Sequence, residues 1–404
     1  MGRTILAILL CVAISCSTLP VQAAATTEVE VIKYAASNYS TVANSTTLNY
    51  ADMQANFTNV YSNGSVYMQG PTFDANDPWG TAGQNMGNYG EHNGTYISNL
   101  TDEVGGMNPG DEVEIHANDG FKRWFNYTNV YEPHERLENM VLTWWDSQYG
   151  YVTNWDDGMR LFFYAPPATY GVNDSLNWTN WDMHESLAPW YWHNYSSTWP
   201  SAKGLSVKYV DQIKIYPPHL HDFNTTGDTT GWAFRHQTSS NPPSTPNDPN
   251  TVFTTALKSN IADDDGTFQT DVTTSNNNYA AHRFNFSIDT SSAKDGPIAD
   301  IEKLNVTWNG KGWHDSGGAA NGTYLYIYNY TSTAYEQLDS NTTTGGEVYL
   351  TGEITSGISN YNSSTNNVTV LVKQTSPQTG DEDKYYSHIE TDYVNMTVRH
   401  HHHN

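Results

Sequence analysis

The strand-like pattern that fills the sequence restricts the fold more than any other feature. Short runs rich in Val, Ile, Thr and aromatic residues follow one another along the chain, and Gly, Asn, Pro and Asp separate them. Examples are EVEVIKY, MRLFFY, HRFNFSI, KLNVTW, TYLYIYNY and NVTVLVKQ. β-Branched and aromatic residues in this arrangement favour strands, and long amphipathic helical patterns are absent. We therefore predict a mainly β fold.

Two short helices and one long loop are expected between the strands. The helices fall around Tyr50 to Phe57 and Ile97 to Val104, where helical segments precede turn signals. The stretch 238–250, TSSNPPSTPNDPN, is the clearest loop. Because 404 residues suggest two or three domains, we place a domain border near Phe223 and assign the Pro-rich stretch to a loop of the second domain.

The first 23 residues have the pattern of a secretory signal peptide. Arg3 precedes an apolar run from Ile5 to Ile14, and the segment ends in an Ala-rich exit. A lipoprotein signal ending at Cys16 is the alternative reading. No later segment has the roughly 20 apolar residues that a membrane span needs. We therefore expect an exported protein without a membrane span, located outside the cell or at its surface.

Both cysteines, Cys11 and Cys16, lie in this expected signal segment. The remaining chain therefore offers no disulfide, no thiolate metal ligand and no cysteine nucleophile, although an exported protein could have used disulfides. Its stability must then come from size and packing, with metal ions as a candidate further source.

The negative net charge argues against nucleic acid as a partner. The chain has 18 Lys and Arg against 43 Asp and Glu, a net charge of -25, and such a surface repels phosphate backbones. Much of the polarity comes from Asn, Ser, Thr and Tyr, and Asn-x-Ser/Thr triplets recur, which is typical of an exported glycoprotein. The glycosylation candidates are Asn38, Asn44, Asn56, Asn93, Asn126, Asn177, Asn194, Asn224, Asn305, Asn341, Asn367 and Asn395.

The order of the segments resembles known domains. In residues 24–222, TLNYADM is followed by GTYISNLTDEVGGMNPGDEVEIHANDGFKRWF, VLTWW, DDGMRLFF and GLSVKYVDQIKIY. This order is similar to the molybdopterin-binding oxidoreductase domain of the sulfite-oxidase type, as it recurs in exported surface proteins of methanogenic archaea. Residues 223–398 resemble a jelly-roll, galactose-binding-like domain of the same proteins. The resemblance implies a mixed α+β, β-rich first domain and a C-terminal jelly-roll β-sandwich.

One departure from the resembled family argues against its chemistry. Enzymes of the sulfite-oxidase type hold their metal with a cysteine, which should lie near FTNVYSNGSVYMQG, and that region has none. Cations that could meet a phosphate-bearing pterin are few in the first domain, with Lys122, Arg123, Arg136 and Arg160 the main candidates. The chain also lacks a Gly-x-Ser-x-Gly elbow, a Walker loop and a His-Glu-x-x-His helix. We therefore expect no molybdopterin and no enzymatic activity.

Two histidine groups raise the question of a transition metal, and a histidine-rich tail is a separate feature that should bind metal on a column without indicating a function. His219 and His221 lie two residues apart with Asp222 beside them, and a second group is formed by Asp182, His184 and Glu185. Hydrogen-bonding roles in loops are the favoured reading of both groups. The tail at residues 399–404, with its run of four histidines, is either native or the remnant of a tag.

A calcium site is the candidate in the second domain. Asp263, Asp264 and Asp265 precede Gly266, and Asp271 follows closely. Hard carboxylate oxygens on a Gly turn suit Ca²⁺, although the spacing is not that of an EF-hand loop. A solvated acidic turn is the alternative.

Nine of the thirteen tryptophans lie between Trp124 and Trp199. Such rings can dock an inserted segment onto a sheet or stack on sugars, and we favour packing. Trp190 and Trp192 are the sugar-stacking candidates, because residues two apart in an extended segment face the same side.

Together these features predict a non-enzymatic extracellular or cell-envelope glycoprotein with a structural or adhesive role. It would associate with copies of itself or with other envelope proteins by pairing strand edges into a lattice or filament. The N-terminal strand EVEVIKY is the expected donor, so that a Lys or Pro at Val31 would block assembly. The alternatives are a glycan-binding module and, third, a pterin-dependent or metal-dependent oxidoreductase.

Overall fold

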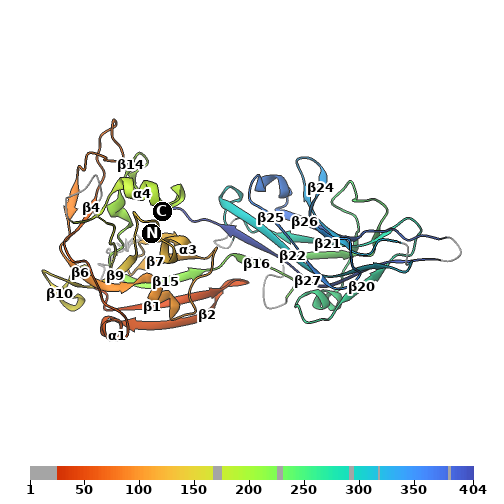
Figure 1. The fold of residues 1–404 in the computed structure, drawn as a ribbon, viewed down its shortest axis with the longest axis horizontal. Coiled ribbons are helices and arrows are strands. Elements are labelled where there is room, and N and C mark those ends of the chain that lie inside the picture. The colour runs from red at the N-terminus through yellow and green to blue at the C-terminus, as the bar shows by residue number, and fades with distance from the viewer. Residues whose placement is uncertain (1–24, 167–174, 225–230, 291–294, 317–318, 381–383) are drawn as a thin grey trace, which may run out of the picture.

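The computed structural model describes residues 25–166, 175–224, 231–290, 295–316, 319–380 and 384–404, and strands dominate it. This confirms the mainly β prediction. The hydrophobic side chains form two main cores, one within residues 29–215 and the other within residues 223–398. Figure 1 shows two strand-rich halves side by side along the longest axis. We call residues 25–218 the first half and residues 219–404 the second half.

The main sheet of the first half has five strands. Their order is β2 (Asn38–Asn49), β1 (Glu28–Ala35), β15 (Val210–Tyr216), β7 (Glu112–Ala117) and β8 (Lys122–Asn126). β1 and β15 are parallel, and the other neighbours are antiparallel.

The position of β1 contradicts the expected donor strand. β1 pairs with β2 on one side and with β15 on the other, and Val31 is fully buried. A substitution at Val31 would therefore damage the core rather than an assembly edge. The edges of this sheet are β2 and β8, and the side chain of Asn404 bonds both the N–H and the C=O of Trp124 in β8.

Smaller sheets and one hairpin complete the first half. One sheet has the order β10 (Gly150–Tyr151), β9 (Met140–Asp146), β6 (His92–Tyr96), β3 (Val60–Tyr61), with β11 (Arg160–Phe163) also paired to β9. Another has the order β12 (Leu176–Trp178), β4 (Val66–Gln69), β5 (Met86–Asn88). The hairpin joins β13 (Asn194–Ser196) to β14 (Trp199–Pro200).

The two predicted short helices are present as α1 (Tyr50–Asn56) and α2 (Ile97–Asp102). Two further helices, α3 (Tyr127–Tyr131) and α4 (Asn180–Ser186), are not anticipated from the pattern. Each begins with a reciprocal capping box, in which the N-cap side chain bonds the N3 amide and the N3 side chain bonds back. The remaining turns of helix are η1 (Val152–Asn154), η2 (Pro189–Tyr191), η3 (Ala202–Leu205), α5 (Thr255–Lys258), η4 (Ser259–Ile261), η5 (Ile298–Asp300) and η6 (Ile358–Tyr361). No helix in the described ranges has the length and apolar character that crossing a membrane would need.

The second half is a sandwich of two antiparallel sheets. The first sheet has the order β16 (His219–His221), β27 (Ser387–His400), β22 (Ile301–His314), β25 (Val348–Ile354), with β20 (Gln269–Val272) also paired to β27. The second has the order β19 (Thr251–Val252), β17 (Trp232–Arg235), β21 (Tyr279–Ser287), β26 (Asn367–Gln374), β23 (Thr323–Asn329), β24 (Ala334–Asn341), with β18 (Gln237–Thr238) paired to β21. Trp308, Phe284 and Phe286 are buried in its core.

Candidate functional site

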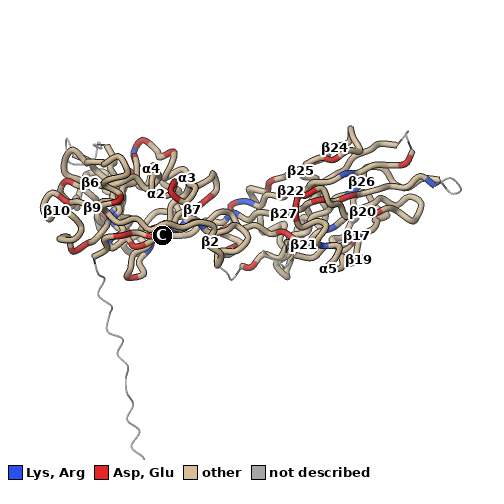
Figure 2. Tube along the Cα trace, turned by 90° about the horizontal axis from the view of Figure 1, so that it is seen from below, with Lys and Arg blue, Asp and Glu red and all other residues tan. Residues whose placement is uncertain are grey.

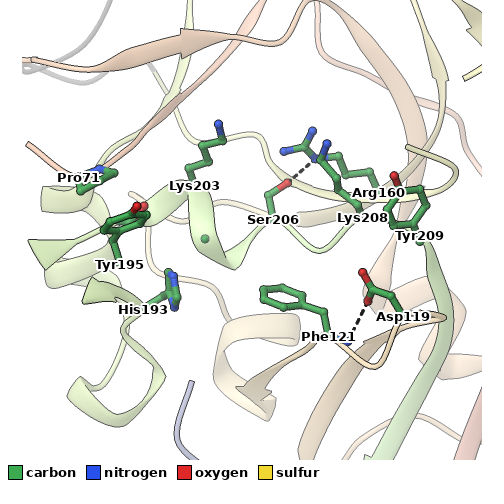
Figure 3. Close-up of a pocket in the computed structure, with 12 residues that line it drawn as sticks. Pro71, Asp119, Phe121, Arg160, His193, Tyr195, Lys203, Ser206, Lys208 and Tyr209 are labelled. Carbon is green, nitrogen blue, oxygen red and sulfur yellow. Dashed lines mark hydrogen bonds between the residues drawn. The ribbon is translucent and has the colours of Figure 1, made fainter. Parts of the chain in front are cut away.

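A cavity of about 410 Å³ in the first half gathers an unusual set of side chains. Its walls come from the start of β11, from η3 and the residues after it, from the turn between β7 and β8, and from β13. Figure 3 shows His193 and Tyr195 on one side, Arg160, Lys208 and Tyr209 on the opposite side, and Lys203 and Ser206 between them. We call it the cationic cavity, after Arg160, Lys203 and Lys208.

Arg160 is the central cation. Its side chain is 3% exposed, its Nε donates to Ser206 Oγ at 2.8 Å, and its Nη1 donates to Asp157 Oδ2 at 2.9 Å. Its Nη2 is buried and has no hydrogen-bond partner among the described residues. Burial lowers the pKa of Arg160, and the charge of Asp157 opposes that shift. The guanidinium lies over the rings of Tyr89 and Phe162, at 4.8 and 5.0 Å from their centres. Because a buried guanidinium N–H without a hydrogen bond is costly, an acceptor that reached this nitrogen would bind favourably.

Two ammonium groups share the cavity. Lys208 Nζ lies 2.7 Å from Asp157 Oδ1, and Lys203 Nζ lies 5.6 Å from the centre of the Tyr89 ring. Acidic residues greatly outnumber basic ones in this chain, as the sparse Lys and Arg of Figure 2 show. The cavity brings together three cations, whereas the carboxylates near them are the lining Asp119 and the paired Asp157. The local charge is therefore positive, in contrast to the negative charge of the whole chain.

His193 and Gly204 shape the floor of the cationic cavity. Arg123 Nη2 lies 2.9 Å from His193 Nδ1, and burial together with the charge of Arg123 lowers the pKa of His193 to about 4. The imidazole is therefore neutral, and its Nδ1 accepts from the arginine. A Cβ on Gly204 would lie 1.8 Å from His193 Cδ2, so no larger residue fits there without moving the ring.

Open aromatic rings flank the cations. Tyr195 is 65% exposed and Phe121 is 40% exposed, and both line the cavity. Phe73, which is also exposed, packs edge-on to Tyr195 with ring centres 5.7 Å apart. Aromatic faces beside fixed cations suit a ligand that has both an apolar face and a negative group.

Sequence reasoning identified only part of this site. Of the four cations named for the first domain, Arg160 lines the cavity and Arg123 holds its histidine, whereas Arg136 pairs with Asp182 and Lys122 pairs with Glu114. Lys203, Lys208 and Tyr195 were missed, because nothing in their spacing shows that η3 and β13 converge on β11.

The tryptophan candidates for sugar stacking are occupied by protein contacts. Trp190 stacks on His401 with ring centres 4.1 Å apart. Trp192 packs against Trp79 and His184, and its Nε1 donates to Leu187 O at 2.9 Å. The segment around them forms the 3₁₀ turn η2 rather than an extended strand, so the expected common face does not exist. The packing role favoured for these rings agrees with their contacts.

The acidic turn of the second half does not bring together the four aspartates expected to form a calcium site. Asp263, Asp264 and Asp265 are exposed on one turn, but Asp271 is buried in β20, where it pairs with Arg235 and His282. Asp271 is therefore removed from the candidate calcium set. Asp264 instead lies with Glu347 and Asp392, and one ligand oxygen from each lies within 4.8 Å of the others.

Asn309 connects these carboxylates. Its Nδ2 donates to Asp264 at 2.8 Å and to Glu347 at 2.9 Å, and its buried Oδ1 has no hydrogen-bond partner in the described part of the chain. A hydrogen bond from Tyr349 lowers the pKa of Asp264, whereas burial raises the pKa of Asp392. The three carboxylates are ligands that Ca²⁺ accepts, whereas the Asn309 amide faces them with its NH₂ group.

We expect millimolar Ca²⁺ to raise the melting temperature of the full chain. An ion at 100 times its Kd would add about 2.7 kcal/mol to the free energy of unfolding. Asp264→Ala should abolish the shift in a thermal melt, and Asp265→Ala, on the same turn but outside the carboxylate group, should retain it. Equal shifts for Asp264→Ala and the parent protein would identify the turn as merely solvated.

The histidines at the start of the second half form a buried hydrogen-bonded group. His219 Nδ1 and His221 Nε2 lie 2.6 and 2.9 Å from the same oxygen of Asp295. Burial raises the pKa of Asp295, but the hydrogen bonds from both imidazoles outweigh it and hold the pKa well below its usual range. The imidazoles thus make hydrogen bonds, but from the buried strand β16 rather than from a loop, and the partner Asp295 was not anticipated. One ligand atom from each of these three residues lies within 4.8 Å of the others, so the metal alternative for His219 and His221 stays a prediction.

The side chains of the other histidine group, Asp182, His184 and Glu185, do not come together at one point. Asp182 caps α4 and pairs with Arg136 at 2.9 Å, whereas His184 bonds the neighbouring Glu185 at 3.0 Å. The three side chains therefore serve helix capping and local pairing.

Eleven of the twelve glycosylation candidates have some exposed surface, and Asn177 has none. Asn177 lies in β12, is fully buried, and donates from Nδ2 to Ser175 O at 2.6 Å. A glycan there would require β12 to open, so Asn177 is removed from the candidate set. Asn38 and Asn44 lie on the edge strand β2, where glycans would cover the open edge.

Comparisons with known proteins give limited information. Residues 228–400 match a family model described as the C-terminal domain of an uncharacterized protein. No curated protein sequence matches the chain.

Two solved structures are similar to parts of the chain. The CBM22-1 xylan-binding domain of Xyn10C from Paenibacillus barcinonensis has 13% identity and a TM-score of 0.19, covering 34% of this chain and 84% of that domain. The sulfane dehydrogenase SoxCD from Paracoccus pantotrophus has 10% identity and a TM-score of 0.28, covering 81% of this chain and 63% of that chain. At these TM-scores neither similarity carries an argument about function.

The molybdenum cofactor implied by the sequence resemblance does not fit the residues present. That family ligates its metal with cysteine, and the described residues contain none, because both cysteines precede residue 25. The segment 57–70, where the ligand is expected, contributes β3 and β4 without a thiol.

Proposed function

We propose that this protein is a non-enzymatic extracellular binding protein that holds an acidic saccharide in the cationic cavity. The observation that carries the proposal is Arg160, which lines a cavity shared with two ammonium groups and two exposed aromatic rings, and whose buried Nη2 has no hydrogen-bond partner among the described residues. A carboxylate or sulfate group would supply the missing acceptor in a charge-assisted hydrogen bond. The apolar face of a sugar ring would lie against Tyr195 or Phe121.

The contacts of the lining residues favour binding over catalysis. The Ser206 hydroxyl donates to Leu161 O at 2.6 Å and accepts from Arg160, so no base holds it as a nucleophile. Asp119 accepts the amide N–H of Phe121 at 2.9 Å, and His193 is engaged by Arg123. The cavity volume of about 410 Å³ lies within the range typical of small-ligand sites.

An extracellular setting gives this site its context. The signal-like N terminus, the Asn-x-Ser/Thr triplets and the acidic composition support export and glycosylation. Saccharides bound at a cell surface would give the protein an adhesive role. Assembly through the N-terminal strand loses its support, because β1 is an internal strand.

The matched pair D-glucuronic acid and D-glucose tests the proposal, since the two differ only at C6. In isothermal titration calorimetry we expect glucuronate to bind at least tenfold more tightly than glucose, with an affinity that falls as salt increases. Lys203→Gln should weaken glucuronate binding about tenfold, and Tyr195→Ala should weaken it further. Lys303→Gln, on the surface of the second half, is the control and should change nothing.

Two outcomes would contradict the proposal. Equal binding of both sugars would show that the cations do not select the ligand. Absence of glucuronate binding at low salt in a folded protein would remove the cavity as a saccharide site.

A further inference from the structure

The histidine-rich tail is packed against both halves of the protein. β27 extends out of the sandwich, and Figure 1 shows the C terminus within the first half. The amide N–H of Asn404 donates to Trp190 O at 3.0 Å, and its side chain bonds Trp124 and Tyr191 at 2.7 to 3.0 Å. These contacts fix the positions of the four preceding histidines.

The histidines alternate between two environments, as residues of an extended segment do. His402 stacks on Trp124 with ring centres 3.6 Å apart and bonds Glu112 at 2.6 Å, and His400 lies beside it. His401 and His403 form the second pair. His401 stacks on Trp190, and His403 Nε2 lies 3.1 Å from Asp300 Oδ1.

We propose that Asp300, His401 and His403 form a site for a divalent transition metal ion such as Zn²⁺. One ligand atom from each residue lies within 4.8 Å of the other two. His401 Nδ1 is buried and has no hydrogen-bond partner among the described residues. Two imidazole nitrogens and one carboxylate oxygen are a donor set that suits Zn²⁺.

The backbone and the surroundings favour the same site. The amide N–H of His401 donates to Asp300 O at 3.0 Å, which holds the tail in register with the end of η5. A cavity of about 260 Å³ borders all three residues and leaves room for a water as fourth ligand. Glu114 and Lys122 also line this cavity and pair with each other at 3.2 Å.

The bound ion would tie the tail more firmly to the second half at Asp300, while Trp190 and Asn404 hold it to the first half. This site is independent of the cationic cavity and uses none of its residues. A run of histidines can also bind metal without any built site, so the experiment must separate the two.

Zinc titration of the full chain by calorimetry distinguishes the proposed three-residue site from the histidine run alone, because only the three-residue site includes Asp300. We expect Asp300→Ala to weaken Zn²⁺ binding at least tenfold and to remove the rise in melting temperature that Zn²⁺ causes in the parent protein. Asp315→Ala, which removes a comparable carboxylate facing His388 at 2.8 Å, is the matched control and should leave both values unchanged.

A second variant guards against misfolding. The His403 side chain is 60% exposed, so His403→Ala should fold normally and also weaken binding at least tenfold. Co²⁺ bound to the parent protein should give the intense visible absorption of a four-coordinate ion, and the Asp300→Ala protein should not. Zinc affinity and Co²⁺ absorption in folded Asp300→Ala equal to those of the parent protein would overturn the site and assign metal binding to the histidine run alone.

Discussion

Replacing Asp295 with alanine is expected to lower the free energy of unfolding by about 3–5 kcal/mol. Asp295 is fully buried and accepts hydrogen bonds from His219, His221 and the amide N–H of Asp289. Its removal leaves buried donors without an acceptor, and each such donor costs about 1–3 kcal/mol. Urea unfolding of the full chain measures the change.

Asp315→Ala is the matched control for this prediction. Asp315 also bonds a histidine, His388, but its side chain is 37% exposed. Exposed pairs contribute about 0–1 kcal/mol, so this variant should unfold almost as the parent protein does. If Asp295→Ala were no less stable than Asp315→Ala, the buried group would have no structural role.

Replacing Lys373 with methionine should stabilise the protein by about 1–4 kcal/mol at pH 6. Lys373 lies in β26, is fully buried, and forms no ion pair among the described residues. Its Nζ donates to Gln374 O at 2.8 Å and lies 3.8 Å from the centre of the Tyr279 ring. These contacts compensate only part of the cost of burying a charge, and methionine fills similar space without that cost.

The pH dependence gives this prediction a second readout. Burial lowers the pKa of Lys373 to about 7, whereas an unfolded lysine titrates near 10.5. Between these values the unfolded chain binds a proton that the folded chain does not, so stability rises with pH by about 1.4 kcal/mol per unit. The advantage of Lys373→Met should therefore shrink from pH 7 towards pH 10, a trend that Lys303→Met, at the surface, should not show. A constant difference across this range would place the Lys373 ammonium in contact with solvent.

The elements that depend on local sequence were predictable. The alternating segments became strands, and α1 and α2 fall where turn signals end short helical runs. Helix α4 begins with Thr179 and Asp182, which match the sequence motif of a capping box, so a search for that motif would have found it. Helix α3 has Asn126 and Asn129 in these positions, which the motif does not include.

The candidate sites depend on contacts between distant segments, which one sequence does not reveal. Asp295 lies 76 residues after its partner His219 in the sequence. Asp271 pairs with Arg235 and His282 instead of lying with the aspartates of the acidic turn. Whether β1 is an edge depends on its pairing with β15, about 180 residues later. The same limit applies to the cationic cavity, where Arg160 meets residues of η3 and β13.

A crystal structure of the protein with bound D-glucuronate would show directly whether the cationic cavity holds an acidic saccharide. We expect the carboxylate within hydrogen-bonding distance of Arg160 Nη2, with the sugar ring against Tyr195 or Phe121 and Lys203 directed towards the negative group. Glucuronate bound elsewhere on the protein, or a cationic cavity filled only by solvent at a saturating ligand concentration, would contradict this expectation.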